Sequence, residues 1–598
     1  MSDPESPKSS PGAPTTHVEA RGPSHSPPRP ADESASRVRR LVASAAVGLA
    51  TLAVMLATEP SLAIVWDEGY TLGREARLRT WFRALGDPAA FAATWTPPVQ
   101  ELVQQVGAQP PRPDQVDARG KLLFDSRVLA YFWPFAREEP HGHPPFYALL
   151  GLKGDVLAPG LPDLSRARLG PIMLFSLAAA GLFHFVARRW GWWAAAVAAG
   201  AWVFQPNLFG HGHYAAYDGP LSSLWLLAIF CFVAAVERDD DPAPRRLAWL
   251  PALAFGVFLG CAMADKLTGW FLPLPFLAWA ILYRRRRAFE VLAMGIGVGV
   301  VVVFLLNPSW WTEPIAGPLR FFRSNLTRGK TIPIPVMFLG RIYQTPVESL
   351  PWYNTIVWTV LVTPVGFLLL ALAGAYRAVA RWKAEPVVLL ILGHWLFLLA
   401  LRAMPNTPGH DGVRLFLPAF GVLALLTGPG VEQMRTWLGK GSRWIASASL
   451  IEGVASVLLM LPAPLAYYSP LVGGPAGAAR LGMEPTYYWD GLDADALAWL
   501  RSETAPGRTI QFSTFPTSWL YLRETGALPR RLVPLDRGTP QWYVLQNRPG
   551  AWNARDRILA TRAKPAYTVS KLGVPLVWIF PYEALQEAAR DALPETGR

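Results

Sequence analysis

The fold is decided by an apolar run at residues 41–58, LVASAAVGLATLAVMLAT, and by the stretch AIVWDEGY that follows at residues 63–70. The run has no charged residue and is long enough for one bilayer crossing. Three arginines precede it: Arg37, Arg39 and Arg40. Such a cluster predicts a cytoplasmic N-terminus. Asp67 and Glu68 are therefore expected at the outer membrane surface, where a side chain can meet both a lipid-linked molecule and water. A solvated loop carboxylate is the alternative.

The composition is typical of a membrane enzyme or transporter. Hydrophobic residues make up 52% of the chain and charged residues 17%, against about 25% charged residues in an average soluble protein. The net charge of +13 is compatible with nucleic-acid binding. The basic residues, however, cluster between apolar runs and fit orientation signals, so no nucleic-acid partner is expected. Cys231 and Cys261 both lie in apolar runs and lack metal-ligand spacing.

Ten further apolar runs predict a mainly α, polytopic membrane protein with about eleven transmembrane helices. They lie at residues 169–187, 192–209, 219–236, 247–264, 268–283, 288–306, 353–376, 386–402, 413–430 and 444–462. An odd number places the C-terminus outside the inner (plasma) membrane. Every predicted inner connection carries at least two Lys or Arg, whereas the outer connection 206–218 carries none.

The apolar runs divide the chain into three parts. Residues 1–36 are rich in Pro and Ser and predict a disordered cytoplasmic tail. Residues 37–462 form the transmembrane domain, with helices expected on the outer surface within 66–168 and 307–352. Residues 463–598 predict a small extracytoplasmic α/β domain, with helices at 493–502 and 554–563 and strands at 509–513, 542–546, 567–571 and 576–580.

Four polar motifs fall on the predicted outer face. They are Asp67-Glu68, HGHPPFY at 141–147, HGHYAAYDGP at 211–220, and DKLTG at 265–269. Ionisable groups near the membrane are costly and tend to be functional. Each motif also has a plainer interpretation: loop or packing roles for the histidines, helix capping for Asp218 and snorkelling for Lys266. The two His-x-His pairs leave a divalent metal possible, but no third ligand is evident and no cofactor is predicted with certainty.

The order of these motifs resembles glycosyltransferase family 39. Asp-Glu follows the first helix, His-Pro-Pro precedes the second, Asp-x-Pro opens the fourth and Lys-x-Thr-Gly opens the sixth. That family includes protein O-mannosyltransferases and the bacterial aminoarabinose transferases of lipid A, and it belongs to the GT-C superfamily of polytopic sugar transferases. The similarity spans residues 40–430 and includes NPSWWTEP at 307–314 and HDGVRLFLP at 410–418.

The resemblance implies a membrane glycosyltransferase with a GT-C-like fold and a polyprenyl-phosphate sugar as donor. The acceptor is a glycan, a lipid or a protein. Asp67 matches the first-loop acid taken as the catalytic base, and Lys266 falls where a basic residue can meet the donor phosphate. Three acids are assigned to catalysis: Asp67, Glu68 and Asp218. Six residues are assigned to substrate binding: His143, His211, His213, Lys266, His410 and Arg414. The chain departs from the aminoarabinose transferases in its His-Gly-His-Tyr before Asp218, where an Arg-rich pattern is common, and this leaves the sugar open.

The residues fit this chemistry independently of the resemblance. An acceptor hydroxyl that attacks an anomeric carbon needs a carboxylate within hydrogen-bond reach to take its proton. A departing phosphate develops charge that a fixed Lys or Arg stabilises. The alternative function is a transporter or flippase of lipid-linked sugars. Against it, the chain shows no evident internal repeat, and its polar motifs gather at one membrane face instead of the midplane.

Overall fold

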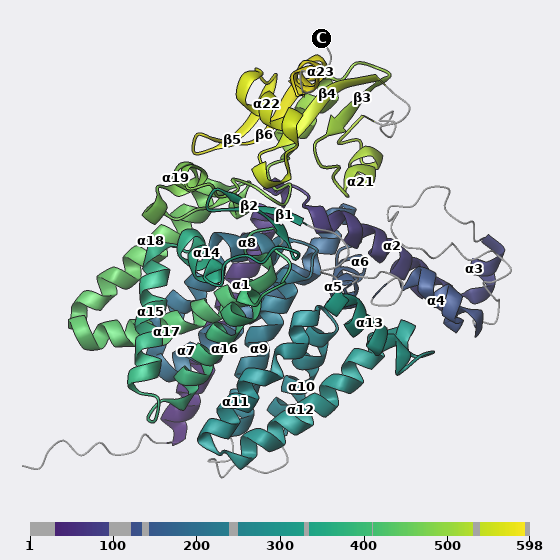
Figure 1. The fold of residues 1–598 in the computed structure, drawn as a ribbon. Helices are drawn as coiled ribbons and strands as arrows, with labels where there is room; N and C mark the ends of the chain where they lie inside the picture. Colours follow the sequence, from purple (N-terminus) through teal and green to yellow (C-terminus); the bar gives the residue numbers. More distant parts are fainter. Residues whose placement is uncertain are drawn as a thin grey trace, which may run out of the picture.

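The computed structural model describes residues 30–94, 121–133, 135, 143–237, 249–327, 334–409, 411–529 and 539–592. Long apolar helices form one bundle, and a small sheet domain lies over one of its ends (Figure 1). In the described part of the chain, six spans are long and apolar enough to cross a membrane. They are Ser36–Ser61, Asp163–Phe204, Asp218–Glu237, Arg286–Leu305, Pro386–Ala403 and Pro418–Met460.

In the described part of the chain, ten helical segments coincide with the predicted apolar runs, and α7 holds two of these runs on either side of a kink at Gly191 (φ 86°, ψ 173°). They are α1 (Pro30–Thr58), α7 (Asp163–Phe204), α9 (Asp218–Glu237), α10 (Leu250–Met263), α11 (Pro273–Tyr283), α12 (Arg286–Leu305), α15 (Val365–Ala380), α16 (Pro386–Ala403), α17 (Pro418–Leu438) and α18 (Ser442–Met460). The mainly α, polytopic fold class is thereby confirmed. Helix α1 begins at Pro30, inside the segment 1–36 that was predicted to be disordered.

Two predicted runs differ from the observed helices in their ends. Helix α7, which contains most of run 192–209, ends at Phe204. The His-x-His pair lies in a separate buried helix, α8 (Pro206–His213). Run 353–376 is divided into α14 (Asn354–Val362) and α15. Pro364 lies between these two helices and has no N–H to continue the first.

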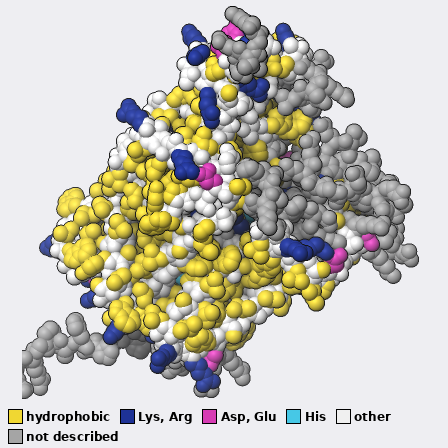
Figure 2. Space-filling model, in the orientation of Figure 1, with side chains coloured by type: hydrophobic (Ala, Val, Ile, Leu, Met, Phe, Trp, Pro, Cys, Tyr) yellow, Lys and Arg dark blue, Asp and Glu magenta, His cyan; other side chains and the backbone are white. Residues whose placement is uncertain are grey.

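The surface of the bundle is suited to lipid. Figure 2 shows hydrophobic side chains over most of the visible bundle, with Lys and Arg mainly towards its ends. Large apolar side chains are well exposed on different helices, such as Ile281 on α11 (59%) and Ile451 on α18 (69%). Exposed apolar surface on this scale is expected where hydrocarbon replaces water.

One long helix, α2 (Trp66–Gly86), and several shorter ones cover the end of the bundle that carries the polar motifs. The shorter ones are α3 (Pro88–Thr94), α4 (Ser126–Phe132), α5 (Phe146–Gly151), α6 (Lys153–Leu157) and α13 (Ala316–Thr327). These fit the predicted surface helices. The segment 336–343, also expected to be helical, instead forms the antiparallel hairpin β1 (Ile334–Phe338) and β2 (Arg341–Thr345). Its turn passes through Leu339 and Gly340, both at positive φ, and alternate strand residues are buried.

After α18 the chain passes through α19 (Gly474–Arg480) into a four-stranded sheet of order β3-β4-β6-β5. The strands are β3 (Arg508–Phe512), β4 (Thr539–Gln546), β5 (Tyr567–Lys571) and β6 (Val574–Pro581). Only the β3–β4 pair is parallel. The helices are α20 (Ala494–Glu503), α21 (Trp519–Glu524), α22 (Ala554–Arg562) and α23 (Tyr582–Asp591). All four predicted strands, the hairpin at Gly573 and two of these helices are present, whereas α21 and α23 were not predicted.

Candidate functional site

Asp67 lies in the first turn of α2, at the junction between the bundle and the C-terminal domain, with its residue only 7% exposed. Its Oδ2 accepts a hydrogen bond from the Tyr488 hydroxyl at 2.7 Å. The Tyr217 hydroxyl and the Arg414 guanidinium donate to the same oxygen. Burial opposes ionisation, but Arg414 and the two tyrosines outweigh it and lower the pKa of Asp67. The carboxylate is therefore ionised at neutral pH.

A second carboxylate, Asp218, stands beside the first at the start of α9. Its Oδ1 accepts from the Lys266 ammonium at 2.5 Å, and its Oδ2 lies 3.6 Å from Arg414 Nη1. Arg414 thus lies between two carboxylates. The Lys266 ammonium also lies 4.7 Å from the centre of the Tyr217 ring. Both cations are buried, and a buried cation is stable only where counter-charges surround it.

A further layer of charge connects this cluster to the C-terminal domain. Asp411 receives Arg414 Nη2 at 2.9 Å on one side and Arg548 Nη1 at 3.0 Å on the other. Arg548 Nε lies 3.7 Å from Glu484. Tyr488, Glu484 and Arg548 were not predicted as site residues. The aromatic group YYWD at 487–490, which stands after the membrane runs, is the signal that could have indicated Tyr488.

Glu68, next to Asp67 in sequence, has a different environment. Its two carboxylate oxygens pair with Arg168 Nε at 2.7 Å and Nη2 at 2.8 Å. They also accept the backbone N–H groups of Val65 at 3.0 Å and Ala215 at 2.9 Å. Arg168 reaches Glu59 as well, at 3.1 Å. Glu68 therefore joins α2, α7 and the segment before α9, and it holds the Asp67 turn in place.

The three predicted histidines that the structure describes lie in different surroundings. His213 contacts the carbonyl oxygens of Phe209 (2.7 Å) and Met55 (3.0 Å), and so connects α8 with α1. His143 lies against Tyr217, with 3.7 Å between the ring centres. His211 is buried between Tyr214 and Tyr488, and neither ring nitrogen has a hydrogen-bond partner among the described residues. Burial lowers the pKa of His211 to about 4, so its ring is neutral at pH 7.

His141 and His410 lie outside the described residues. Among the residues described, no group of three or more His, Cys, Asp or Glu side chains could hold a metal ion. A divalent metal therefore stays an untested expectation. Asp265, in the same motif as Lys266, is fully buried, and within the described part of the chain neither of its carboxylate oxygens has a hydrogen-bond partner. Burial and then the charge of Asp218 raise its pKa well above the ordinary value.

Residues 155–311 match the model of the dolichyl-phosphate-mannose-protein mannosyltransferase family. The predicted resemblance is confirmed. The match spans α7 to α12 and includes Asp218 and Lys266, and it indicates the predicted class of enzyme, a glycosyltransferase. It does not extend to Asp67 or Arg414. No curated protein sequence matches the chain.

The solved structures that are similar to this chain at low identity include the following two. ArnT from Cupriavidus metallidurans, bound to undecaprenyl phosphate, is 16% identical over 90% of this chain and 97% of that chain, with a TM-score of 0.47. The archaeal oligosaccharyltransferase AglB from Archaeoglobus fulgidus, in complex with an inhibitory peptide and a dolichol-phosphate, is 11% identical over 83% of this chain and 69% of that chain, with a TM-score of 0.43.

Proposed function

We propose that this protein transfers a sugar from a polyprenyl-phosphate donor to an acceptor hydroxyl at the extracytoplasmic membrane face, with Asp67 as the base. The observation that carries the proposal is the buried, ionised Asp67 carboxylate beside Arg414 and the Lys266–Asp218 pair. A carboxylate and two cations at one point provide both a proton acceptor and a phosphate-binding charge. The family match over residues 155–311 supports the reaction class.

The geometry suggests how Asp67 would accept the proton. Its three donors, Arg414, Tyr217 and Tyr488, all contact Oδ2. None of them contacts Oδ1, which is therefore the oxygen available to an acceptor hydroxyl. As the acceptor oxygen bonds to the anomeric carbon, the bond from that carbon to the phosphate breaks, and the hydroxyl proton passes to Asp67. The polyprenyl phosphate leaves with the electron pair of the broken bond.

Lys266 and Arg414 are the groups that would stabilise the charge on the departing phosphate. Both are buried, so water screens their charges weakly. Each is now held by carboxylates, Lys266 by Asp218 and Arg414 by Asp67 and Asp411. Asp218 is placed to keep Lys266 directed towards the cluster, where the departing phosphate would meet it. The neutral, buried His211 is a polar side chain that adds no charge there.

The placement of the cluster favours a transferase over the alternative of a transporter. A transporter holds its substrate near the bilayer midplane. Here Asp67 and Asp218 lie at helix starts at one end of the bundle, below the C-terminal domain (Figure 1). Tyr488 from that domain reaches the same carboxylate, so the C-terminal domain contributes a side chain to the cluster.

The test is incubation of the purified full chain with a panel of labelled polyprenyl-phosphate sugars and an envelope lipid and glycan fraction as acceptor. We expect the labelled sugar of one donor to be transferred to an acceptor. Sealed vesicles loaded with the same donors give the comparison for transport. Movement of an intact donor across the bilayer without loss of its sugar would contradict the proposal and support a flippase.

A further inference from the structure

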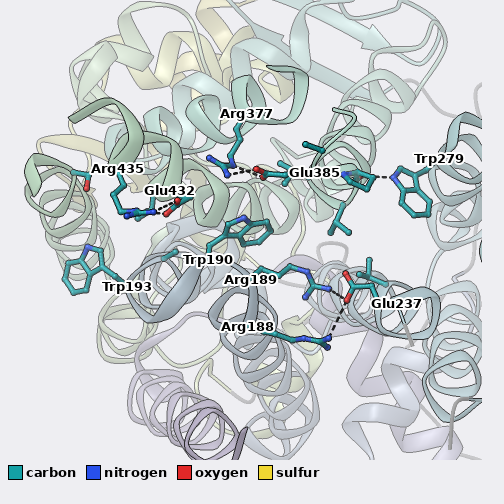
Figure 3. Close-up of a pocket in the computed structure, with 18 of the residues that line it drawn as sticks. Arg188, Arg189, Trp190, Trp193, Glu237, Trp279, Arg377, Glu385, Glu432 and Arg435 are labelled. Carbon is teal, nitrogen blue, oxygen red and sulfur yellow. Dashed lines mark hydrogen bonds and ion pairs between the residues drawn. The ribbon is translucent and has the colours of Figure 1, made fainter. Parts of the chain in front are cut away.

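A large charged cavity lies at the opposite end of the bundle from Asp67. Its volume is about 1290 Å³, and helices α7, α9, α11, α15, α16 and α17 contribute to its wall (Figure 3). Asp218 begins α9 in the candidate site, and Glu237 ends α9 in the wall of this cavity. With 20 residues in α9, the two ends are about 30 Å apart, the thickness of a bilayer core. The cavity therefore belongs to the other membrane surface.

The cavity wall carries an excess of positive charge. Seven cationic side chains line it: Arg188, Arg189, Arg285, Arg377, Arg435, Lys440 and Arg443. Three carboxylates oppose them, and the shortest contact of each to a wall arginine is Glu237 to Arg189 at 2.6 Å, Glu385 to Arg377 at 2.5 Å and Glu432 to Arg435 at 2.6 Å. Glu237 also lies 3.9 Å from Arg188, and Glu385 lies 2.8 Å from Arg381 outside the cavity wall. Four cations are left over in the described wall. Of these, Arg285, Lys440 and Arg443 form no ion pair within the described part of the chain.

The side chains around the cavity are typical of a membrane interface. Trp190, Trp193 and Trp279 line it together with the arginines (Figure 3). Trp193 is 43% exposed, whereas Trp279 is buried and donates its indole N–H to the Pro386 carbonyl at 2.7 Å. Trp rings beside Arg and Lys are characteristic of the level of lipid headgroups.

An apolar groove continues from this cavity along α11 and α16. Trp279 lines both, and the rest of the groove wall is apolar, including Leu282, Leu396 and Phe397. Its volume is about 400 Å³. Leu282 and Leu396 are half exposed on the outside of the bundle, so the groove faces the lipid. A basic cavity joined to an apolar groove matches a ligand with an anionic head and a hydrocarbon chain.

We propose that the cavity binds the phosphate-bearing headgroup of an anionic membrane lipid, with a hydrocarbon chain of that lipid in the α11–α16 groove. The three cations without an ion pair take the phosphate, and the tryptophans define the depth of the headgroup. A soluble phosphate compound would use the charges but would leave the groove without a function. This site is separate from the Asp67 cluster, and it does not depend on the proposed sugar transfer.

The headgroup part is tested with the full chain, stripped of lipid in a neutral detergent and titrated with phosphatidylglycerol or phosphatidylcholine of equal chain length. Native mass spectrometry measures the binding. The proposal expects phosphatidylglycerol to bind at least tenfold more tightly. The triple variant Arg285→Gln, Lys440→Gln, Arg443→Gln should lose affinity for phosphatidylglycerol on the order of 100-fold, since each interfacial cation contributes about fivefold.

The matched control changes three exposed cations near the same end that do not line the cavity: Arg284, Arg286 and Lys383. Equal losses in both triple variants would overturn the proposal.

The chain part is tested by filling the groove. Gly393 lines it, and a Cβ built there has no atom within 4 Å, so the leucine of Gly393→Leu begins in open space and extends into the groove region. Gly297 on α12 is equally open and does not line the groove, so Gly297→Leu is the control. Gly393→Leu should weaken phosphatidylglycerol binding about tenfold, and Gly297→Leu should not change it. Unchanged binding in Gly393→Leu, or glycerol phosphate binding as tightly as the lipid, would overturn the proposal.

Discussion

At the scale of single residues, the site depends on two adjacent acids with opposite environments. Successive residues on a helix point about 100° apart. Asp67 therefore faces Arg414 and the tyrosines, while Glu68 faces Arg168. The sequence predicted one membrane surface for both acids but could not separate their environments, because their surroundings come from distant segments. Tyr488 is 421 positions from Asp67, and nothing in local sequence predicts that contact.

Removal of the Tyr488 hydroxyl should shift the pH dependence of transfer. Its hydrogen bond helps to lower the pKa of Asp67, and the base must be ionised to act. In Tyr488→Phe we expect the acidic limb of the pH–rate profile to move to higher pH by about one unit. The control is Tyr543→Phe, which removes a 2.6 Å hydrogen bond to Asp556 in the C-terminal domain. An unchanged limb in Tyr488→Phe would show that Asp67 does not set it.

Glu68→Gln should reduce stability, because it leaves Arg168 buried with one counter-charge fewer. Breaking a buried ion pair costs about 3 kcal/mol or more. Thermal unfolding of the purified variant should therefore begin at a clearly lower temperature than in the wild type. Glu290→Gln, which removes an exposed ion pair with Arg286 (3.0 Å), is the control and should have little effect. Equal stability of both variants would contradict the structural role given to Glu68.

At the scale of elements, the C-terminal domain is held to the bundle by a few buried polar side chains. Glu484 accepts backbone N–H groups from Met337 in β1 (3.4 Å) and from Gly550 (3.2 Å), and it faces Arg548. The helices and strands of both parts were largely predictable because their periodic apolar patterns are local. The β1–β2 hairpin was not predictable, since its short apolar stretch fits a surface helix equally well. Its structure depends on contacts with residues distant in the sequence, such as Glu484.

Ionisation of Glu484 should weaken the connection between the C-terminal domain and the bundle as the pH rises through neutrality. Burial raises its pKa to about 7, from an ordinary value of 4.5. The folded protein therefore binds this proton more tightly than the unfolded chain, so the stabilisation is complete below pH 4.5 and is lost as the pH rises through 7.

In Glu484→Gln, which resembles the protonated form, the fall in melting temperature across pH 7 should be smaller than in the wild type. Thermal unfolding measured on both sides of pH 7 gives the comparison. The control is Glu524→Gln, since the Glu524 side chain is 59% exposed. Identical pH profiles for wild type and Glu484→Gln would exclude this role.

At the scale of the whole molecule, the two ends of the bundle have distinct chemistry. One end holds the buried charge cluster under the C-terminal domain, and the other holds the basic cavity with its tryptophans (Figures 1 and 3). The order and sidedness of the polar motifs predicted which residues gather, because successive outer turns of a helical bundle meet at one surface. They could not predict the contribution of the C-terminal domain, which depends on how that domain packs on the bundle.

The predicted orientation can be tested with single cysteines in intact cells. After replacement of Cys231 and Cys261, a cysteine at the exposed Ser502 in α20 should react with an impermeant maleimide on the outer side of the inner membrane. A cysteine at Lys440, beside the basic cavity, should react only after permeabilisation. The reverse pattern would place the Asp67 cluster in the cytoplasm.

The most direct test of the central claim is the rate of sugar transfer by Asp67→Asn, with the lipid-linked donor that the wild type uses. Asp556→Asn, a change at another buried carboxylate that lies outside the cluster, controls for folding. Loss of a general base typically lowers the rate about 10²- to 10⁴-fold. We predict a loss of that size in Asp67→Asn, with donor binding retained and Asp556→Asn near wild type. A folded Asp67→Asn that transfers sugar at the wild-type rate would contradict the account.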